Sequence, residues 1–409
     1  MKIMHINCSC LGSTGKIIQE IASACKLIGW ETVLCAPVPE KKMDFTTYKT
    51  SFKYEQGIYR RLCYFVGLQY GFAPISTFKI INIIKKEKPD VVHIHSANCN
   101  MVNIYKMLGY LKKNSISTVI TNHAEFFYTG SCVHAYECQQ WIKGCIKCEN
   151  RYTATHSKFF DMSPVAWKKM RKAFEGFSNI QIVSVSEWIN SRAKTSMILG
   201  SLPNMTVRNG VNTNTFFYRD NCYEKEKYNI PDGYKIVLHV TVHFSALDNH
   251  PKGGKHIIKL AQALENDKII VLVVGKSSVS TSDIPNNIRI LGEVVDQSVL
   301  AELYSLADLT VISSIRETYS MPVAESLCCG TPVVGFRAGG PETIAMKEFS
   351  KFVDYGDIKS YAEAVRSLIE LKKEVGACNI SKKAIKEYSS TVMSQQYIKV
   401  YDRLSNGKK

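Results

Sequence analysis

The chain alternates short, continuous apolar runs with longer segments in which apolar residues recur at helical spacing. Near the N-terminus, MKIMHINC and ETVLCAP each predict a strand, and KIIQEIASACKLIG between them predicts a helix. Three later runs lack the polar alternation of a half-exposed strand: PDVVHIHSA, ISTVITNHA and NIQIVSVSEWI. Strands that are buried on both faces have this pattern, so it predicts a parallel, doubly wound α/β sheet.

After the loop VRNGVNTNTFFYRDN the same pattern begins again. Its apolar runs, separated by helical segments, are YKIVLHVTV, KIIVLVVG, IRILGEV, DLTVISSI and TPVVGF. A chain of 409 residues is long for a single core, so we expect two Rossmann-like, doubly wound domains with a ligand cleft between them. We assign residues 1–210 to the first domain, 211–385 to the second, and 386–409 to a closing helix that packs back on the first.

Composition narrows the class of protein. No apolar run is long enough to cross a bilayer, and the N-terminus lacks a signal-peptide pattern, so we expect a cytoplasmic protein. The 14 cysteines are then expected to be reduced, with any tight cluster a candidate metal site. Lys and Arg exceed Asp and Glu by 52 to 36, which favours an anionic partner such as nucleic acid, a phosphorylated ligand or an acidic membrane.

The densest mixture of basic and aromatic residues lies in residues 48–88. Aromatic rings suit the apolar edge of a bilayer, and cations suit anionic headgroups, so this region is a candidate membrane-docking surface. The alternative is a solvated helix with some aromatic side chains facing the core. Both interpretations stay open at this point.

The most informative motif is SSIRETYSMPVAESLCCGTPVVGFRAGGPET. Glu317 ends the loop after a predicted strand, and Glu325 lies in the helix that opens near Pro322. A helix N-terminus presents unpaired N–H groups and partial positive charge, which suits a diphosphate. A carboxylate further along the helix can accept both hydroxyls of a ribose, as acidic residues do in dinucleotide folds.

The Glu-x7-Glu pair, Pro322, CCGTPVV and the AGGPE turn resemble the nucleotide-sugar signature of glycosyltransferase family 4, a retaining group with the two-domain GT-B architecture. Within that family, TNHAEFFYTGSC is similar to bacterial exopolysaccharide transferases of the colanic-acid type, although Ala124 stands where those proteins commonly have Asp. The resemblance implies transfer of a hexosyl unit from a nucleotide diphosphate sugar to a glycan or lipid-linked acceptor. Capsule, exopolysaccharide or lipopolysaccharide synthesis at the inner face of the plasma membrane is the implied setting.

The resemblance also assigns roles in the second domain. Glu325 matches the residue that binds the donor ribose, Glu317 the residue that contacts the transferred sugar, and Lys252 the lysine that neutralises the leaving diphosphate. The arginine that usually precedes this lysine is absent. Its candidate substitutes are Arg316, Arg337 and Lys276. The further residues expected to bind the donor are Arg316, Ser320 and Met321.

In the first domain, Gly12 and Gly15 match the loop that faces the donor diphosphate and sugar, and His123 matches a catalytic histidine at a strand end. Taken alone, the glycine pair reads as an ordinary turn and the histidine as a structural residue. GSTGKI is not a P-loop, because Ile17 stands where Ser or Thr would bind magnesium.

No Asp-x-Asp pair occurs in the chain, so we expect no catalytic metal. Two alternative functions are a zinc-containing nucleic-acid-binding protein and a dinucleotide-dependent oxidoreductase. The first does not account for the Glu pair at a strand-to-helix junction. The second lacks its Gly-x-Gly-x-x-Gly fingerprint. We therefore expect no nucleic-acid partner, and the resemblance implies a nucleotide-sugar donor.

Four cysteines lie in the loop 129–150, which contains TGSCVHAYECQQWIKGCIKC. A Cys-x2-Cys knuckle and two earlier thiols can complete a tetrahedral zinc shell, which would be structural because it leaves no open position. The expected ligands are Cys132, Cys138, Cys145 and Cys148, with His134 or His156 as substitutes. The alternative is a set of ordinary buried, reduced cysteines.

Overall fold

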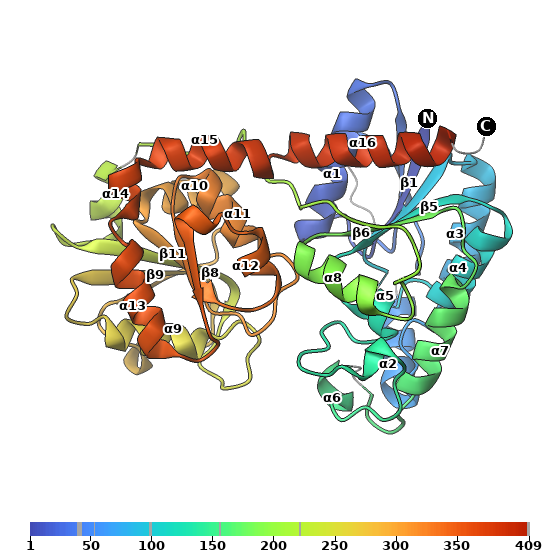
Figure 1. The fold of residues 1–409 in the computed structure, drawn as a ribbon, viewed down its shortest axis with the longest axis horizontal. Helices are drawn as coiled ribbons and strands as arrows, with labels where there is room; N and C mark the ends of the chain where they lie inside the picture. Colours follow the sequence, from blue (N-terminus) through green and yellow to red (C-terminus); the bar gives the residue numbers. More distant parts are fainter. Residues whose placement is uncertain (39–42, 53, 98–99, 155–156, 221, 407–409) are drawn as a thin grey trace. The chain divides into compact units, whose positions relative to one another are not determined.

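The computed structural model describes residues 1–38, 43–52, 54–97, 100–154, 157–220 and 222–406. The chain divides into two compact units (Figure 1). Unit 1 comprises Met1–Arg208 together with Met393–Lys409, and unit 2 comprises Asn209–Val392. None of the described helices is both long and apolar enough to cross a membrane.

Unit 1 is built on a seven-stranded parallel sheet with strand order β3-β2-β1-β4-β5-β6-β7. The strands are β1 (Lys2–Ile6), β2 (Glu31–Ala36), β3 (Thr46–Lys49), β4 (Val91–Ile94), β5 (Ser117–Asn122), β6 (Ile180–Ser184) and β7 (Asn204–Thr206). The helices are α1 (Gly12–Leu27), α2 (Glu55–Val66), α3 (Pro74–Glu87), α4 (Ile104–Lys113), α5 (Phe126–Thr129), α6 (Arg151–Ala154), α7 (Ser163–Phe174), α8 (Glu187–Thr195) and, from Met393 onward, α16 (Ser390–Asn406). The predicted parallel sheet is confirmed.

The two faces of this sheet are covered by different helices, because successive side chains of a strand point to opposite sides. On one face, side chains such as Ile3, Val91 and Val119 pack with α1 and with the part of α16 that belongs to unit 1. On the other face, the intervening residues Met4 and Ile120 pack in a core that includes α3, α4 and α7. Strands buried on both faces explain the unbroken apolar runs of the sequence.

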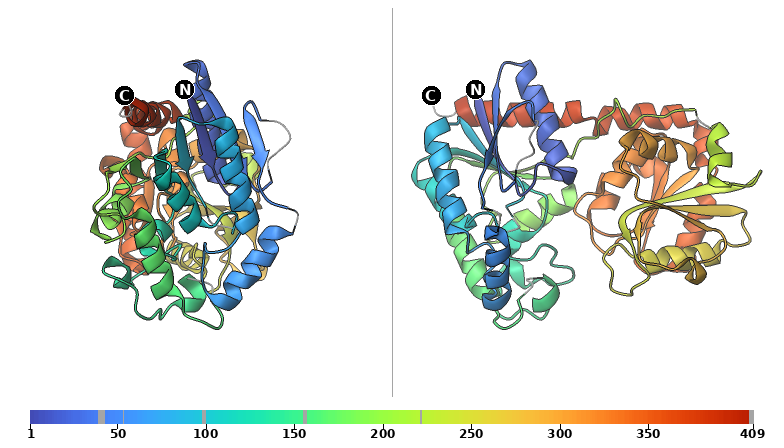
Figure 2. Two further views of the ribbon diagram at one scale, coloured as in Figure 1. Left: turned by 90° about the vertical axis from the view of Figure 1, so that its right-hand side faces the viewer. Right: turned by 180° about the vertical axis from the view of Figure 1, so that it is seen from behind.

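Unit 2 is built on a six-stranded parallel sheet with strand order β10-β9-β8-β11-β12-β13. Figure 2 shows this unit from two further sides, in colours from yellow-green to red. The strands are β8 (Lys235–Phe244), β9 (Ile269–Ser277), β10 (Ile288–Gly292), β11 (Leu309–Ile312), β12 (Val333–Phe336) and β13 (Ser350–Val353). The helices are α9 (Gly254–Ala263), α10 (Gln297–Leu306), α11 (Met321–Cys328), α12 (Gly340–Ile344), α13 (Ile358–Leu368), α14 (Leu371–Val375) and α15 (Ala377–Tyr388).

Each sheet has a point where the strand order reverses. In unit 1 the chain runs from β1 to one side and from β4 to the other, and in unit 2 the same is true of β8 and β11. The loops that leave two such neighbouring strands diverge and open a crevice at the carboxyl ends of the strands, where ligands of doubly wound folds bind. The predicted site residues should therefore lie on these loops.

Candidate functional site

At the reversal point of unit 2, the loop after β8 meets the loop after β11. Lys252 Nζ lies 2.5 Å from Glu317 Oε1, and Ser314 Oγ donates a hydrogen bond of 2.8 Å to the same oxygen. The side chains of Lys252 and Glu317 are 35% and 17% exposed, so both can be reached by a ligand. The structure therefore brings two of the predicted catalytic residues into direct contact.

Close backbone packing holds Lys252 in this position. Gly253 has φ +64°, and a Cβ atom on it would lie only 2.0 Å from the carbonyl oxygen of Ser313. Ser313 Oγ in turn donates a hydrogen bond of 2.8 Å to the carbonyl oxygen of Lys252. A glycine is required here for both reasons, which explains the glycine that follows the lysine in the sequence.

The AGGPE turn fixes the backbone of Glu317. The amide of Glu317 donates to the carbonyl of Ala338 at 3.0 Å, and the amide of Gly340 donates to the carbonyl of Glu317 at 2.9 Å. Glu342 accepts hydrogen bonds from the amides of Ala338 and Gly339 at the start of α12. Glu342, the acidic residue of this motif, thus stabilises the turn, and the turn positions Glu317.

Helix α11 begins directly after this loop. Ser320, its N-cap residue, is buried and has φ +81°, a left-handed conformation that favours glycine. Met321, which was predicted to bind the donor, is the first helical residue and is half-buried. The N-terminal amides of a helix suit an anion, so this position remains compatible with a diphosphate.

Glu325 lies one turn into α11, where it meets Tyr304 of α10. The Tyr304 hydroxyl donates a hydrogen bond of 3.2 Å to Glu325 Oε2. Burial next to this carboxylate raises the pKa of Tyr304 well above its ordinary value, so the hydroxyl keeps its proton and acts as a donor. Tyr304 orients the carboxylate, and it was missed by the sequence analysis because no motif links it to a residue 21 positions away.

The three candidate substitutes for the missing arginine differ in their ion pairing and in their distance along the chain from the catalytic candidates. Arg337 forms an ion pair with Asp354, and Lys276 Nζ lies 3.3 Å from Glu293 Oε2 with both side chains largely exposed. Arg316 is half-buried and directly precedes Glu317 in the loop after β11. Of the three, Arg316 is the one that shares a loop with a catalytic candidate.

In unit 1, the two predicted glycines shape the start of α1. Gly12, with φ +71°, is the first residue of the helix, and its Cβ position is open. A Cβ on Gly15 would lie 2.3 Å from the carbonyl oxygen of Cys10, so only glycine allows this approach. The loop after β1 is thereby drawn tightly over the first turn of the helix.

His123 directly follows β5 and is half-buried. Its Nε2 lies 3.1 Å from Nδ1 of His95, which follows β4. Loss of hydration lowers the pKa of His123 to about 4, so its ring is neutral near pH 7. His95 was missed as a site residue, although the alternation in VVHIHSA was a signal that His93 and His95 share a sheet face.

The four predicted zinc ligands lie in one loop region of unit 1. Three of them, Cys132, Cys138 and Cys148, line a cavity of about 330 Å³. Burial is the main cause that raises the pKa of the Cys145 thiol, to about 12, and the neighbouring Cys138 and Cys148 add to it. Cys145 Sγ also contacts the carbonyl oxygen of Thr129 at 3.9 Å.

The zinc ligand set is not assembled in this structure. Among the described residues, the one group of three or more metal-binding side chains with all ligand atoms within 4.8 Å of one another consists of histidines. Of the two substitute ligands, His134 Nδ1 lies 3.8 Å from Glu125 Oε2, and His156 lies outside the described residues.

Comparison with known proteins identifies two domain types. Residues 15–215 match the family model Glycosyltransferase Family 4, and residues 223–388 match Glycosyl transferases group 1. N-acetyl-alpha-D-glucosaminyl L-malate synthase of Bacillus anthracis is 24% identical over 48% of this chain and 52% of its own length, so the match spans about half of that relative. The putative colanic acid biosynthesis glycosyl transferase WcaC of Escherichia coli is 23% identical over 79% of this chain and 78% of its own length.

Solved structures show the same fold over the full length. Anabaena Alr3699/HepE in complex with UDP-glucose is 15% identical, with a TM-score of 0.63 over 98% of this chain and all of that one. The two doubly wound domains are thus of the GT-B class.

Proposed function

Because the chain belongs to the glycosyltransferases, with family 4 and group 1 domains, we propose that it moves a hexosyl unit from a nucleotide diphosphate sugar to an acceptor hydroxyl with retention of the anomeric configuration. The observation that carries this proposal is the contact of Lys252 with Glu317 at the reversal point of unit 2. The nucleotide-sugar donor is further supported by the complex of HepE with UDP-glucose.

The proposed chemistry follows from the charges at this site. As the glycosidic bond breaks, negative charge grows on the diphosphate, which Lys252 and the first amides of α11 bind more tightly in the transition state. Glu317 accepts hydrogen bonds from the sugar hydroxyls and stabilises positive charge at the anomeric carbon. Glu325, oriented by Tyr304, accepts the ribose hydroxyls.

For the residues of unit 1, the proposal keeps the roles that the family implies. Gly12 and Gly15 form the loop for the donor diphosphate, and His123 contacts the transferred sugar and its phosphate. The acceptor attacks from the leaving-group side, since no carboxylate is assigned as a covalent nucleophile. The chemistry is metal-independent, because the chain has no Asp-x-Asp pair to hold a divalent cation.

A ligand panel tests the class of protein. We expect nucleoside diphosphates to raise the melting temperature and random nucleic acid to give no gel shift beyond that of a protein with matched charge. A specific nucleic-acid shift without any stabilisation by nucleoside diphosphates would support the nucleic-acid-binding alternative. Stabilisation by NAD alone would support an oxidoreductase.

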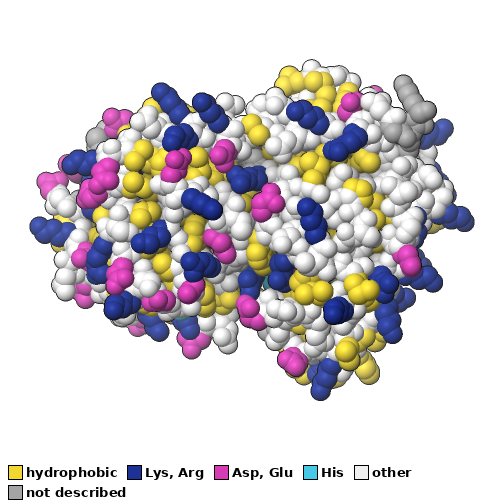
Figure 3. Space-filling model, in the orientation of Figure 1, with side chains coloured by type: hydrophobic (Ala, Val, Ile, Leu, Met, Phe, Trp, Pro, Cys, Tyr) yellow, Lys and Arg dark blue, Asp and Glu magenta, His cyan; other side chains and the backbone are white. Residues whose placement is uncertain are grey.

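The surface around α2 supports a membrane-bound acceptor. Helix α2 exposes Ile58, Leu62 and Phe65 together with Arg60 and Arg61. Two further exposed aromatic side chains, Phe52 and Tyr54, directly precede α2 in the sequence. Phe159, which contacts Phe65 of α2, and its neighbour Phe160 are exposed as well. Hydrophobic and basic side chains are interspersed on the face of the molecule drawn in Figure 3.

A ring contact links α2 to the segment that contains Phe159. The rings of Phe65 and Phe159 stack with centroids 5.3 Å apart, and Lys158 lies over the Phe159 ring at 5.6 Å. Exposed aromatic rings flanked by cations match the boundary between anionic headgroups and acyl chains. We propose that this surface docks peripherally on the inner face of the plasma membrane, where a lipid-linked acceptor for surface polysaccharide is available.

Neutralising Arg60 and Arg61 together, as R60Q/R61Q, is expected to weaken binding to anionic vesicles about 30-fold, since each cation near such a surface contributes about 1 kcal/mol. Raising the salt concentration should weaken the wild type as well, because it screens the charges. Vesicle co-sedimentation measures both effects. The matched control is K359Q/K382Q, which removes two exposed cations from unit 2. Equal loss in both double variants would contradict docking through α2.

We also propose that the loop 129–150 binds one structural zinc ion through its four cysteines. The cavity lined by Cys132, Cys138 and Cys148 provides the space. Binding requires the thiols to deprotonate, and the sulfurs must come closer together than in this structure, where no three of them lie within 4.8 Å of one another. This loop follows His123 closely, so the ion would stiffen the chain beside the proposed site.

About one equivalent of zinc per chain is therefore expected in the purified protein. Prolonged chelation should lower the melting temperature and the activity together, because structural zinc contributes directly to folding stability. Elemental analysis with a melting curve measures both. Metal-free protein with an unchanged melting temperature and full activity would show that these are ordinary core cysteines.

A further inference from the structure

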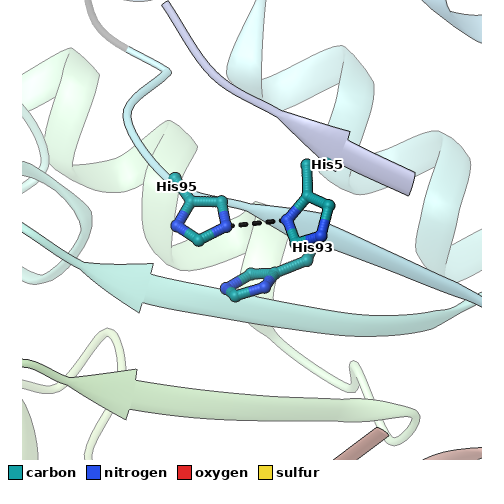
Figure 4. Close-up of side chains that lie close together, drawn as sticks. All are labelled: His5, His93 and His95. Carbon is teal, nitrogen blue, oxygen red and sulfur yellow. Dashed lines mark hydrogen bonds between the residues drawn. The ribbon is translucent and has the colours of Figure 1, made fainter. Parts of the chain in front are cut away.

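Four histidines lie along one face of the unit 1 sheet. His5 of β1 pairs in register with His93 of β4, and His95 and His123 follow at the carboxyl ends of β4 and β5. The same face is apolar further back along the strands, where it packs with α1 and α16. Three of the rings, His5, His93 and His95, lie close together (Figure 4), and all three are fully buried.

Three of the four rings form a continuous hydrogen-bonded chain. His5 Nδ1 lies 2.9 Å from His95 Nε2, and His95 Nδ1 lies 3.1 Å from His123 Nε2. His93 stands outside this chain, because its Nδ1 is bonded to the Tyr401 hydroxyl at 2.6 Å and its Nε2 to Thr121 Oγ1 at 2.8 Å. The chain thus leads from a buried ring to the catalytic candidate His123.

Each ring in the chain carries a single proton. Burial lowers the pKa of His5 to about 3 and that of His95 well below its ordinary value, so both rings are neutral near pH 7. A neutral imidazole has one N–H donor and one acceptor nitrogen. Each hydrogen bond pairs one N–H donor with one acceptor nitrogen, so the tautomer of one ring determines the tautomers of the other two.

The surroundings of His5 determine which nitrogen donates in each hydrogen bond between the three histidines. Nε2 of His5 is buried without a hydrogen-bond partner among the described residues. If the chain ran from His123 toward His5, this nitrogen would carry a buried N–H with no acceptor, the rarer and costlier kind of unsatisfied group. In the opposite direction, Nδ1–H of His5 donates to His95, and Nδ1–H of His95 donates to Nε2 of His123.

We infer that His5 and His95 are positioning residues that lock His123 in its Nδ1–H tautomer, with Nε2 held as an acceptor. Resting on the proposed function, this makes His123 a neutral hydrogen-bond donor to the sugar or its phosphate through Nδ1, and not a general base. Because His5 on β1 and His95 after β4 fix the His123 ring, its Nδ1–H group is already oriented and does not have to reorient during the reaction.

A metal ion is the competing explanation for the three buried rings, whose ligand atoms all lie within 4.8 Å of one another. Both nitrogens of His93 are already hydrogen-bonded. The group also contains no carboxylate or thiolate, so a divalent cation would bring its full charge into a buried site. The hydrogen-bonded chain satisfies the same rings without that cost.

Nitrogen NMR of protein labelled with 15N-histidine tests the inference independently of activity. In the wild type near pH 7.5, His123 is expected to show a protonated Nδ1 and an unprotonated Nε2. Replacing His5 by Leu removes the first donor of the hydrogen-bonded series. His123 should then shift toward the Nε2–H tautomer, although His5 is hydrogen-bonded to His95 and not to His123 itself. H5N keeps an amide donor near the position of Nδ1 and should retain the wild-type tautomer.

The kinetic expectation is a loss of about tenfold in kcat for H5L, with a much smaller change in donor KM and with rescue in H5N. The matched control Y401F removes a hydroxyl from the same buried face but leaves the chain intact, so His123 should keep its tautomer. A protonated Nε2 on His123 in the wild type, or a metal ion bound to these rings, would overturn the inference. Absence of transferase activity with every donor would instead count against the proposed function, while the tautomers could still be read.

Discussion

Replacing Glu317 by Gln is expected to lower kcat by about 100-fold, with a much smaller change in donor KM. The amide still fills the space and accepts a hydrogen bond from Ser314, but it lacks the charge that stabilises a positive anomeric carbon. The substitution also removes the ion pair between Lys252 and Glu317. Steady-state kinetics with a saturating acceptor separates the effects on kcat and KM.

The control for this variant is E348Q, which neutralises an exposed carboxylate paired with Lys383 in the same unit. It should leave both kinetic constants near wild type. If E317Q raised KM and left kcat unchanged, Glu317 would contribute to ground-state binding, and its assignment to the reacting sugar would be wrong.

Replacing Glu325 by Ala should weaken donor binding by roughly 100-fold, because hydrogen bonds to a charged group contribute about 1.5–3 kcal/mol each. The carboxylate is assigned to the ribose, which is present in the free nucleoside diphosphate as well as in the full donor. Calorimetric titration with the nucleoside diphosphate therefore measures this contact without any turnover.

Tyr304→Phe provides the graded comparison for that experiment. It removes the hydroxyl that donates to Glu325 but keeps the carboxylate, so the loss of affinity should be several times smaller. Wild-type affinity in Glu325→Ala would remove the ribose assignment. An equal loss in both variants would show that orientation by Tyr304 matters as much as the charge itself.

The main features of the fold could be predicted from the sequence, because strands buried on both faces leave unbroken apolar runs. The short strands β3, β7 and β13 were missed. Their sequences TTYK, NMT and SKFV are largely half-buried or exposed and show no apolar run. The strand order could not be predicted either, because it depends on hydrogen bonds between strands that lie far apart in the sequence.

The sequence can propose candidate site residues only where a local motif marks them. Glu317, Glu325 and Lys252 stand in such motifs, and the structure places Lys252 against Glu317. Tyr304 and His95 contact candidate site residues that lie 21 and 28 positions away, and no local spacing in the sequence reveals such contacts. The cysteines show the opposite case, because close spacing in the sequence did not bring their sulfurs into one shell.

Cleavage of a nucleotide diphosphate sugar by this chain can be measured by proton NMR of the purified protein with a set of such donors in excess EDTA. We expect at least one donor to release its nucleoside diphosphate, and the released or transferred sugar to appear first with the anomeric configuration of the donor. E317Q should abolish most of the signal. Turnover that requires added magnesium or manganese, or a product of inverted configuration, would contradict the proposed mechanism. Failure to turn over or bind any nucleotide sugar would contradict the proposed function itself.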